Sequence, residues 1–274
     1  MNYKCLTIGG FDSSGGAGIQ ADLKTFTSLG CYGMSILTAS PIQNTCGVKK
    51  CYDLPLSAIE DQLHVVFSDI KPDAIKIGML FSREIIELIV NFFKKNVKNI
   101  PIILDPVMVA TSGHALLKED AIEVLIDDLF PLADIITPNI PEAKKILSYC
   151  NGDDIINLDC IVKKLLSTGI KSVLLKGGHD IHNSVSSDIF IDKTEKITRF
   201  NAQRIKTTNT HGTGCTLSSA ITSFMARGAT LIKACEYAKK YITGAINSAN
   251  KKNKIGGGNG PVDHCFLVDD NLIS

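Results

Sequence analysis

The sequence predicts one α/β domain built on a mostly parallel sheet with helices on both faces. Short apolar runs rich in Ile, Leu and Val alternate with longer amphipathic segments along most of the 274 residues. This alternation is typical of right-handed βαβ units, whose crossovers cover both faces of a parallel sheet. Because no Pro/Ser-rich linker, charge block or internal repeat divides the chain, residues 1–274 are expected to form a single domain around one core.

The predicted strands are short apolar runs that mostly close on Gly, Asp or Pro. In chain order they are Lys4–Gly9, Met34–Ala39, Ala74–Gly78, Pro101–Asp105, Ile135–Thr137 and Ser172–Lys176.

The predicted helices occupy the segments between the strands, and two long helices follow near the end of the chain. The helix expected at Ser57–Ser68 carries its apolar residues in the i, i+4, i+7, i+8 pattern of a one-sided helix. The full set is Gly18–Leu29, Ser57–Ser68, Arg83–Lys94, Glu119–Leu129, Pro141–Tyr149, Leu158–Ser167, Cys215–Arg227 and Ile232–Ala249.

One passage breaks the alternation of strands and helices. Ser187–Asp192 and Lys196–Phe200 flank a polar turn at Lys193–Glu195, which predicts a small antiparallel hairpin at the edge of the sheet. In sheets of this class, ligands bind beyond the carboxyl ends of the strands. The residues that follow each predicted strand are therefore the first candidates for a site.

Charge and composition exclude some classes of protein. Lysine and arginine total 29 and aspartate and glutamate total 28, so the formal net charge is +1. A nucleic-acid-binding domain usually shows a clear basic excess, so nucleic acid is not an expected partner. The apolar fraction of 45% and the charged fraction of 21% are ordinary for a globular protein and exclude wholesale disorder.

The cysteines and the apolar stretches favour a cytoplasmic protein. Nine cysteines include no C-x-x-C pair, so zinc-site spacing is absent. The apolar stretch before Gly9 is too short for a signal peptide, and reduced thiols are expected. The longest stretch free of Asp, Glu, Lys and Arg, Thr25–Val48, contains Pro41 and many polar groups, so we expect no membrane span and no membrane partner.

Two glycine-rich segments join a strand or loop to a helix. The first runs from Gly9 to Gly18 and follows neither the dinucleotide nor the phosphate-loop spacing. It either brings backbone close to a ligand or is a simple turn. The second, Gly212-Thr213-Gly214, precedes a long helix and favours an anion site of amide N–H groups. Cys215 follows it, where the helix dipole is expected to lower the thiol pKa; the alternative is a small residue that packs the helix start.

Asn139 and Glu142 lie three residues apart at a predicted helix start, and hence on one face. A carboxylate beside an amide can hold the water shell of Mg²⁺. The same spacing is typical of a capping box, in which the two side chains serve only the helix end. The residues by themselves favour capping.

Other polar residues follow predicted strands. Asp105 and Lys176 each end a strand, and Lys176 is either a phosphate contact or a solvated lysine. Gln43 offers a donor and an acceptor that match an aminopyrimidine edge, although most glutamines have no such role. The glycine-rich loop Gly256–Val262 is either a lid edge near a nucleotide base or a linker.

Seven motifs in this order resemble the ribokinase superfamily and, within it, the bacterial hydroxymethylpyrimidine/phosphomethylpyrimidine kinases of thiamine biosynthesis. The resemblance covers nearly the whole chain. The motifs are Gly15-Gly-Ala-Gly-Ile-Gln-Ala-Asp-Leu-Lys24, Gln43-Asn-Thr-Cys-Gly47, Lys76-Ile-Gly-Met79, Asp105-Pro-Val-Met108, Thr137-Pro-Asn-Ile-Pro-Glu-Ala143, Lys176-Gly-Gly-His179 and His211-Gly-Thr-Gly-Cys-Thr216.

The resemblance implies a ribokinase-like fold, a homodimer, and two successive phosphorylations by ATP and Mg²⁺ at one site, first of hydroxymethylpyrimidine and then of its monophosphate. It also implies a role for individual residues. Cys215 stands where most of the superfamily has an aspartate base, a departure that matches the pyrimidine-kinase branch. The implied assignments are Gln43 on the pyrimidine edge, Ala17, Met79 and Val107 around the ring, Gly212, Thr213 and Gly214 as anion hole, Asn139 and Glu142 at Mg²⁺, Lys176 on the ATP phosphates and Cys215 as base.

Two alternatives remain at this point. A pyridoxal kinase of the same superfamily differs by its substrate, and Gln43-Asn44-Thr45 favours the pyrimidine branch. A non-catalytic protein that binds a vitamin precursor would keep the fold without turnover. The presence of Lys176, Glu142 and the complete Gly212–Cys215 segment favours an enzyme.

Overall fold

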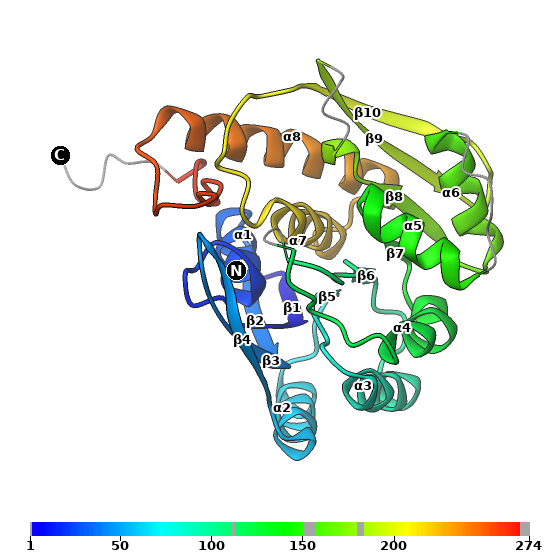
Figure 1. Ribbon diagram of the computed structural model, residues 1–274. Coiled ribbons are helices and arrows are strands. Elements are labelled where there is room, and N and C mark those ends of the chain that lie inside the picture. Colours follow the sequence, from blue (N-terminus) through cyan, green and yellow to red (C-terminus); the bar gives the residue numbers. More distant parts are fainter. Residues whose placement is uncertain (1, 111–112, 151–156, 180–183, 269–274) are drawn as a thin grey trace.

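The computed structural model describes residues 2–110, 113–150, 157–179 and 184–268, and one large sheet forms its centre (Figure 1). Its strands, in chain order, are β1 (Lys4–Gly9), β2 (Tyr32–Leu37), β5 (Ala74–Ile77), β6 (Ile102–Leu104), β7 (Ile135–Ile136), β8 (Ser172–Leu175), β9 (Val185–Asp192) and β10 (Thr198–Gln203). The spatial order is β10-β9-β8-β7-β6-β5-β1-β2. Neighbours from β2 to β8 are parallel, whereas β9 and β10 run antiparallel, so the predicted edge hairpin is confirmed.

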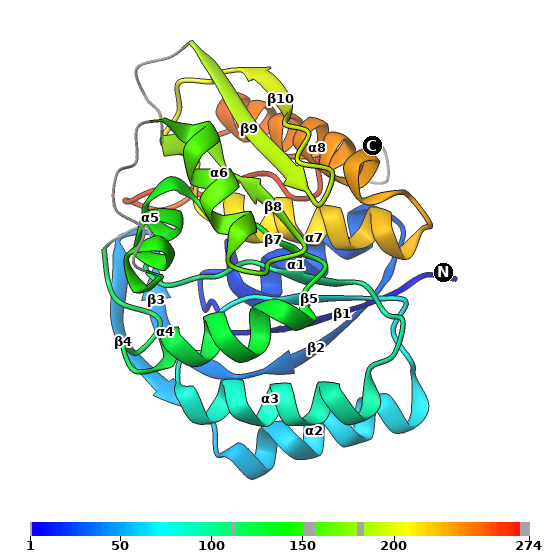
Figure 2. The ribbon, with the colours of Figure 1, turned by 90° about the vertical axis from the view of Figure 1, so that its right-hand side faces the viewer.

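Helices cover both faces of this sheet, as the alternating pattern predicts. They are α1 (Gly18–Ser28), α2 (Leu56–Asp69), α3 (Arg83–Asn96), α4 (Ala121–Val124), α5 (Ile140–Tyr149), α6 (Leu158–Ser167), α7 (Thr213–Ala226) and α8 (Leu231–Lys251). Helices α1, α7 and α8 pack on one face, and α2 to α6 pack on the other (Figure 2). Among the described residues, no helix combines the length and the apolar character that a bilayer span requires.

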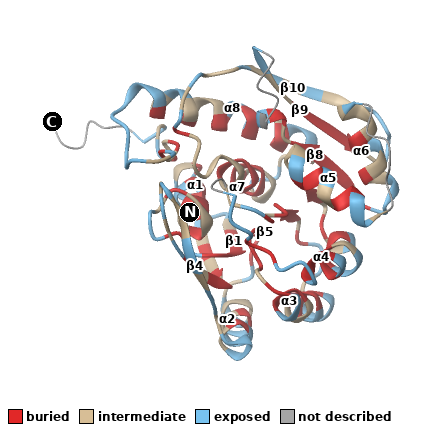
Figure 3. Ribbon diagram, viewed as in Figure 1, coloured by how far each residue is buried: buried red, intermediate tan, exposed pale blue. Residues whose placement is uncertain are grey.

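The core has two halves because successive strand residues point to opposite faces. Ile102 and Leu104 pack with α2 to α6, whereas Ile103 between them packs with α7 and α8. Figure 3 shows the buried residues gathered along the strands and on the inward sides of the helices. Among the buried polar residues, Thr38, Asp105 and Thr137 directly follow the carboxyl ends of β2, β6 and β7.

The second strand differs from the prediction of Met34–Ala39. β2 ends at Leu37, and the chain turns at Thr38 into a separate two-stranded antiparallel sheet of β3 (Ala39–Asn44) and β4 (Gly47–Asp53). The sequence did not predict this sheet. Much of it is exposed, and Pro41 interrupts the alternation of apolar and polar residues that marks a strand.

The helix predicted at Glu119–Leu129 is also different. Only Ala121–Val124 is α-helical; a wider π-helical turn follows at Leu125–Leu129 and a 3₁₀ turn at Phe130–Leu132. Pro131 has no N–H to donate, and its ring clashes with the carbonyl four residues earlier. The change of helix type just before Pro131 has this cause.

Candidate active site

A cavity of about 670 Å³ opens at the carboxyl ends of β1, β5, β6, β7 and β8. The residues that sequence analysis assigned to the site all line it, although they come from distant parts of the chain. They are Ala17, Gln43, Met79, Val107, Asn139, Glu142, Lys176, Gly212, Thr213, Gly214 and Cys215. The position agrees with the rule that ligands of such sheets bind beyond the strand ends.

The elements explain how these residues reach one place. Ala17, Asn139 and Gly212 are the residues that precede the first turns of α1, α5 and α7, and all three helices start at the cavity. Lys176 directly follows β8, and Met79 lies two residues beyond β5. Strand ends and helix starts of βαβ units meet at the same edge of the sheet, so the local pattern predicts this convergence.

Asp12 organises the first glycine-rich segment. Its Oδ2 accepts hydrogen bonds from the backbone N–H of Ala17 at 2.7 Å and of Gly16 at 3.1 Å, and its Oδ1 accepts from the N–H and hydroxyl of Ser14. The side chain is 1% exposed. Burial alone would raise the pKa of Asp12, but the hydrogen bonds from His211 and Ser14 hold it well below its ordinary value.

His211 connects this segment to the second glycine-rich loop. Its Nε2 lies 2.7 Å from Asp12 Oδ2. The next residue, Gly212, has φ +82°, and a Cβ at this position would lie 1.7 Å from the carbonyl oxygen of Gly16. The two loops therefore touch backbone to backbone, and only glycine permits the contact. Sequence analysis missed the Asp12–His211 pair because 199 residues separate the two side chains.

Gly212, Thr213, Gly214 and Cys215 form the start of α7, which is 14 residues long. The first backbone N–H groups of a helix have no partners within it, and the helix dipole adds positive potential there. These N–H groups belong to residues that line the cavity. The arrangement can bind an anion such as a phosphate.

Asn139 and Glu142 form the capping box that their spacing allows. Asn139 Oδ1 accepts from the N–H of Glu142 at 2.9 Å, and Glu142 Oε2 accepts from the N–H of Asn139 at 2.8 Å. The capping interpretation is thus confirmed. Both side chains still line the cavity, so capping holds them at the site.

Lys176 lies between two buried carboxylates. Its Nζ is 2.6 Å from Asp105 Oδ1 and 3.8 Å from Glu142 Oε2. Burial raises the pKa of Glu142 to about 7, since the attraction of Lys176 does not compensate for burial and for the nearby Asp105 carboxylate. Sequence analysis noted that Asp105 ends a strand but gave it no role. In the structure it is the nearest partner of Lys176.

These residues fit a divalent cation. One ammonium group faces two carboxylates and lies 2.6 Å from Asp105 Oδ1 but 3.8 Å from Glu142 Oε2, so a second cation beside Glu142 would balance the remaining negative charge. Within the described ranges, no group of three or more His, Cys, Asp or Glu side chains could enclose a metal ion. Mg²⁺ needs few protein ligands because it keeps several waters and binds substrate phosphates, so this sparse set of donors suits it.

Cys215 corrects one expectation about the site. The helix start was expected to lower its pKa, but burial raises the pKa of the thiol to about 11. Lys76 opposes this rise, whereas Asp22 and Asp105 add to it. The dipole of α7 therefore does not decide the protonation state of Cys215 in the free protein, where the neutral thiol predominates.

Gln43 reaches the cavity from β3 of the small sheet. The register between β3 and β4 shifts between Ile42 and Gln43, and such a bulge redirects the side chain that follows it. The turn after β3 is held by the C-terminal glycine-rich loop, because Thr45 O accepts from the N–H of Asn259 at 2.9 Å. The loop Gly256–Val262 is thus docked on this turn and is not a free linker.

The far end of the cavity was not predicted from the sequence. Apolar side chains of α7 and α8 line it, namely Leu217, Ile242 and Ile246. Beside them, Lys239 Nζ forms a buried ion pair with Asp188 Oδ2 at 3.0 Å. This end has the apolar surface that a flat heterocyclic base requires, with charged groups next to it. The chain offers no local motif here, since the residues are spread over β9 and two helices.

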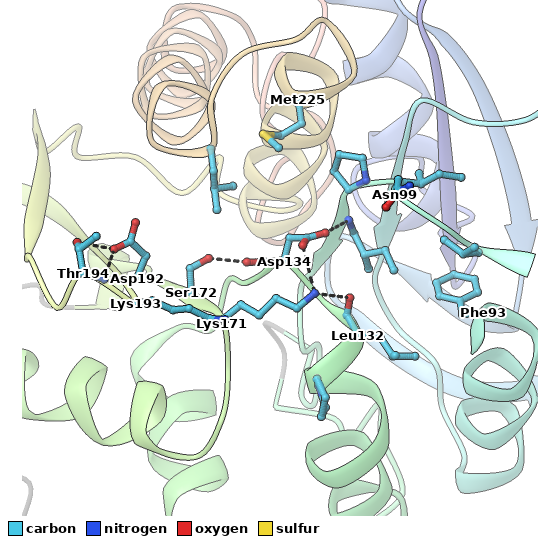
Figure 4. A pocket seen from close by; sticks show the side chains of 16 residues that line it. Phe93, Asn99, Leu132, Asp134, Lys171, Ser172, Asp192, Lys193, Thr194 and Met225 are labelled. Atoms are coloured by element: carbon cyan, nitrogen blue, oxygen red, sulfur yellow. Dashed lines mark hydrogen bonds and ion pairs between the residues drawn. The ribbon is translucent and has the colours of Figure 1, made fainter. Parts of the chain in front are cut away.

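A second cavity, of about 760 Å³, lies at the opposite end of the strands, beside their amino ends (Figure 4). Two of its charged groups bind one another: Lys171 Nζ lies 3.2 Å from Asp134 Oδ1, and Asp134 Oδ2 accepts from the N–H of Ile102 at 2.9 Å. Ser172 Oγ donates to the carbonyl oxygen of Asp134 at 2.6 Å. These bonds join the amino ends of β6, β7 and β8. None of the predicted site residues lines this cavity, and we assign it a structural role.

Comparison with known proteins agrees with this geometry. A family model described as phosphomethylpyrimidine kinase matches residues 12–263. A protein of Rhizobium meliloti named hydroxymethylpyrimidine/phosphomethylpyrimidine kinase is 45% identical over 264 residues, which are 96% of this chain and 97% of the relative.

Two solved structures share the fold. The phosphomethylpyrimidine kinase of Clostridium difficile superimposes with a TM-score of 0.77 at 46% identity, over 89% of this chain and 100% of that one. The pyridoxal kinase of Staphylococcus aureus, solved with AMP-PCP and pyridoxal, superimposes with a TM-score of 0.84 at 32% identity, over 99% of this chain and 95% of that one.

Proposed function

The chain belongs to the phosphomethylpyrimidine kinase family, and from this premise we propose that it transfers the γ-phosphate of ATP first to hydroxymethylpyrimidine and then to the monophosphate so formed. The diphosphate produced is the pyrimidine precursor of thiamine. One observation carries the proposal: the anion-binding start of α7, the Lys176 cluster and Gln43 line the same cavity. A kinase needs a phosphate cradle, a source of positive charge and a selective acceptor pocket in one place.

The acceptor pocket is assigned to the end of the cavity near β3. The amide of Gln43 donates to a ring nitrogen and accepts from the exocyclic amine of the pyrimidine. Ala17, Met79 and Val107 supply the apolar surface around the ring. Support comes from their common place in the cavity lining and from the bulge at Gln43.

The phosphates are assigned to the middle of the cavity. The N–H groups of Gly212, Thr213 and Gly214 stabilise negative charge on the transferring phosphate. Lys176, held by Asp105, contacts the ATP phosphates. Asn139 and Glu142 hold Mg²⁺ through its water shell, and the ion, when bound, neutralises phosphate charge during transfer. The base of ATP is assigned to the apolar end formed by α7 and α8.

Cys215 is assigned as the proton acceptor. The substrate hydroxyl loses its proton to the thiolate form of Cys215, which becomes the thiol, while the substrate oxygen forms a bond to the γ-phosphorus and ADP departs. In phosphoryl transfer the transition state is loose: the bond from the γ-phosphorus to ADP is largely broken before the bond to the substrate oxygen forms. The hydroxyl therefore loses its proton late in the step. Because burial raises the pKa of the thiol to about 11 in the free protein, the thiolate that accepts the proton is a minor form there.

Assembly and location belong to the proposal as well. A homodimer is supported by the small sheet, where Ile42 and Tyr52 lie on one face and are 42% and 52% exposed. A cytoplasmic location is supported by the cysteines: all nine lie in the described ranges, and each is a free thiol.

The test is a coupled assay of ADP release with three acceptors: hydroxymethylpyrimidine, its monophosphate and pyridoxal. We expect turnover with both pyrimidines and a much lower kcat/KM with pyridoxal. The high similarity to a pyridoxal kinase fold makes pyridoxal the second candidate acceptor. Preference for pyridoxal would favour that alternative, and no ADP release with any acceptor would favour a non-catalytic binding protein.

A further inference from the structure

A buried polar cluster lies between the sheet and helices α1 and α7, directly behind the cavity. Lys76 Nζ on β5 donates to Asp22 Oδ2 on α1 at 2.8 Å. Thr7 Oγ1 on β1 donates to the same oxygen at 2.6 Å, and Ser219 Oγ on α7 donates to Asp22 Oδ1 at 2.7 Å. The exposed fraction of Lys76 is 1%, and the other three residues are fully buried. Both carboxylate oxygens are therefore fixed, and so is the ammonium group.

Stability alone does not account for this ion pair. Removing two charges from water costs several kcal/mol, and apolar residues of similar volume often replace such pairs without loss of stability. The neighbours of Lys76 on β5, Ile75 and Ile77, are apolar core residues. A lysine in this strand is therefore the costly choice, which points to a role at the site.

The ammonium group lies toward the cavity. Lys76 is among the residues that line it. Two residues later, Gly78 provides the space, because a Cβ at that position would lie 2.6 Å from Lys76 Nζ. Burial alone would lower the pKa of Lys76, but the nearby acidic groups, Asp22 foremost and then Cys215 and Asp105, together outweigh burial and raise it. The group therefore keeps its positive charge at neutral and moderately alkaline pH.

Cys215 is surrounded by charged groups from several elements. Lys76 acts from β5, Asp22 from α1, Asp105 from the end of β6 and Lys176 from the end of β8. Burial raises the pKa of Cys215, and Lys76 is the strongest influence in the opposite direction. Cys215 lies one turn before Ser219 on the same face of α7, and Ser219 binds the Asp22 carboxylate that holds Lys76. The Lys76–Asp22 pair therefore lies on the side of α7 that carries Cys215, where the ammonium group favours the thiolate.

We propose that Lys76 is a positioning residue whose ammonium group, fixed by Asp22, stabilises the thiolate form of Cys215. The inference deepens the proposed function and rests on it for the role of Cys215 as proton acceptor. No proton leaves Lys76 in this step; its ammonium group supplies a fixed charge while the Cys215 thiolate takes the proton of the substrate hydroxyl. Thr7 and Ser219 keep the Asp22 carboxylate oriented toward the ammonium group.

The experiment measures the alkylation of Cys215 by iodoacetamide in the free enzyme between pH 7 and pH 9.5, with peptide mass spectrometry as readout. Only the thiolate reacts, so below the pKa the rate rises about tenfold per pH unit. We expect Lys76→Met to lower the rate at least tenfold at each pH. The exposed Cys46 is the internal reference, and its rate should not change.

A matched control breaks a different lysine–aspartate pair. Lys171→Met removes the partner of Asp134 at the amino ends of the strands and should leave Cys215 alkylation unchanged. An equal loss in Lys171→Met, or an unchanged rate in folded Lys76→Met, would overturn the proposal. Lys76→Met leaves Asp22 buried without its counter-charge and can prevent folding. In that case, the alkylation rate is measured in the double variant Asp22→Asn/Lys76→Met instead. Its rate should also fall, and a rate at or above that of the unaltered protein would overturn the proposal.

Turnover provides the second readout. In Lys76→Met, kcat should fall at least tenfold while KM for ATP and for the pyrimidine stays the same, because Lys76 acts on proton transfer and not on binding. The alkylation result does not depend on kinase activity. A protein that shows the alkylation change but phosphorylates no acceptor would keep the role of Lys76 and refute the proposed function.

Discussion

The Glu142 carboxylate takes part in two sets of contacts, one in the fold and one in the site. It accepts the N–H of Asn139 in a capping box and lies 3.8 Å from Lys176 Nζ. Neither contact needs a ligand, so folding alone places the carboxylate at the cavity. The polar residues at the strand ends are pre-organised in this way, so less conformational entropy is lost when the substrate binds.

Glu142→Gln should weaken the dependence of turnover on Mg²⁺ and change stability by no more than about 1 kcal/mol, because the amide can still accept the N–H of Asn139. Since the pKa of Glu142 is about 7 in the free protein, protons compete with the ion below that pH. The unaltered enzyme should therefore need more Mg²⁺ at pH 6 than at pH 8, and the variant should show no such difference. Mg²⁺ titrations of turnover at both pH values check this. A variant with the original pH dependence would show that Glu142 only caps α5.

Cys215→Ser should turn over at least tenfold more slowly while it binds ATP and the pyrimidine normally, because general-base assistance contributes around 10²–10⁴ in rate. The eight other cysteines provide matched controls; Cys235, for example, is fully buried in the core and lies outside the cavity lining. Single replacements assayed for ADP release, with calorimetry for binding, compare them. Wild-type turnover in Cys215→Ser would remove the base role and leave catalysis to the amide groups and Mg²⁺.

At the scale of elements, the site depends on the contact between two loops, Gly9–Gly18 and the start of α7. Asp12 and His211 bridge these loops through side chains, and Gly16 and Gly212 touch through backbone. Anything that separates the loops would move the phosphate cradle relative to the acceptor pocket.

Gly212→Ala should abolish nucleotide binding or prevent folding. The added Cβ would lie 1.7 Å from Gly16 O, and the positive φ of +82° adds roughly 1–2 kcal/mol of backbone strain. Gly228→Ala is a matched control, because Gly228 has φ +87° but no atom within 4 Å of its Cβ position. The Gly228→Ala variant should lose stability only by the strain energy and should still bind ATP. Thermal unfolding and ATP calorimetry of both variants test this, and equal effects in the two would show that strain alone, and not the loop contact, matters.

The elements that sequence analysis predicted well are the helices with one buried face and the strands that are buried on both faces, because both have a clear apolar pattern. α6 was predicted with the observed bounds, Leu158–Ser167, and the parallel strands with small differences at their ends. β3 and β4 were missed because a half-exposed sheet with Pro41 lacks a clear period of two. Motifs placed after strands identified residues of the cavity, whereas Asp12–His211 and Lys76–Asp22 were missed, because such pairs arise only when distant segments pack together.

At the scale of the whole molecule, the exposed face of the small sheet is the surface through which we expect two copies of the chain to associate. The small sheet projects from the main sheet beyond β2 (Figure 1), and it presents Ile42 and Tyr52 on its outer face. The same sheet carries Gln43, so association of two chains through this sheet would also restrict the movement of Gln43 in the acceptor pocket.

The protein should therefore have twice the 29.6 kDa mass of one chain at micromolar concentration, measured by size-exclusion chromatography with light scattering. The double variant Ile42→Glu/Tyr52→Glu should shift the mass toward that of one chain, because burying the two carboxylates is unfavourable. Lys49→Glu, at an exposed position on the same sheet, is the charge control. A monomeric unaltered protein would refute the dimer.

The central claim is that one site phosphorylates the pyrimidine twice, and ³¹P NMR of the products tests it most directly. With ATP, Mg²⁺ and hydroxymethylpyrimidine, the monophosphate resonance should appear first and the two resonances of the diphosphate should replace it. Gln43→Ala should slow both steps, since a lost hydrogen bond to a buried group costs about 1–3 kcal/mol, or roughly 5- to 150-fold. A monophosphate that accumulates without conversion, or a variant that slows only one step, would contradict the claim.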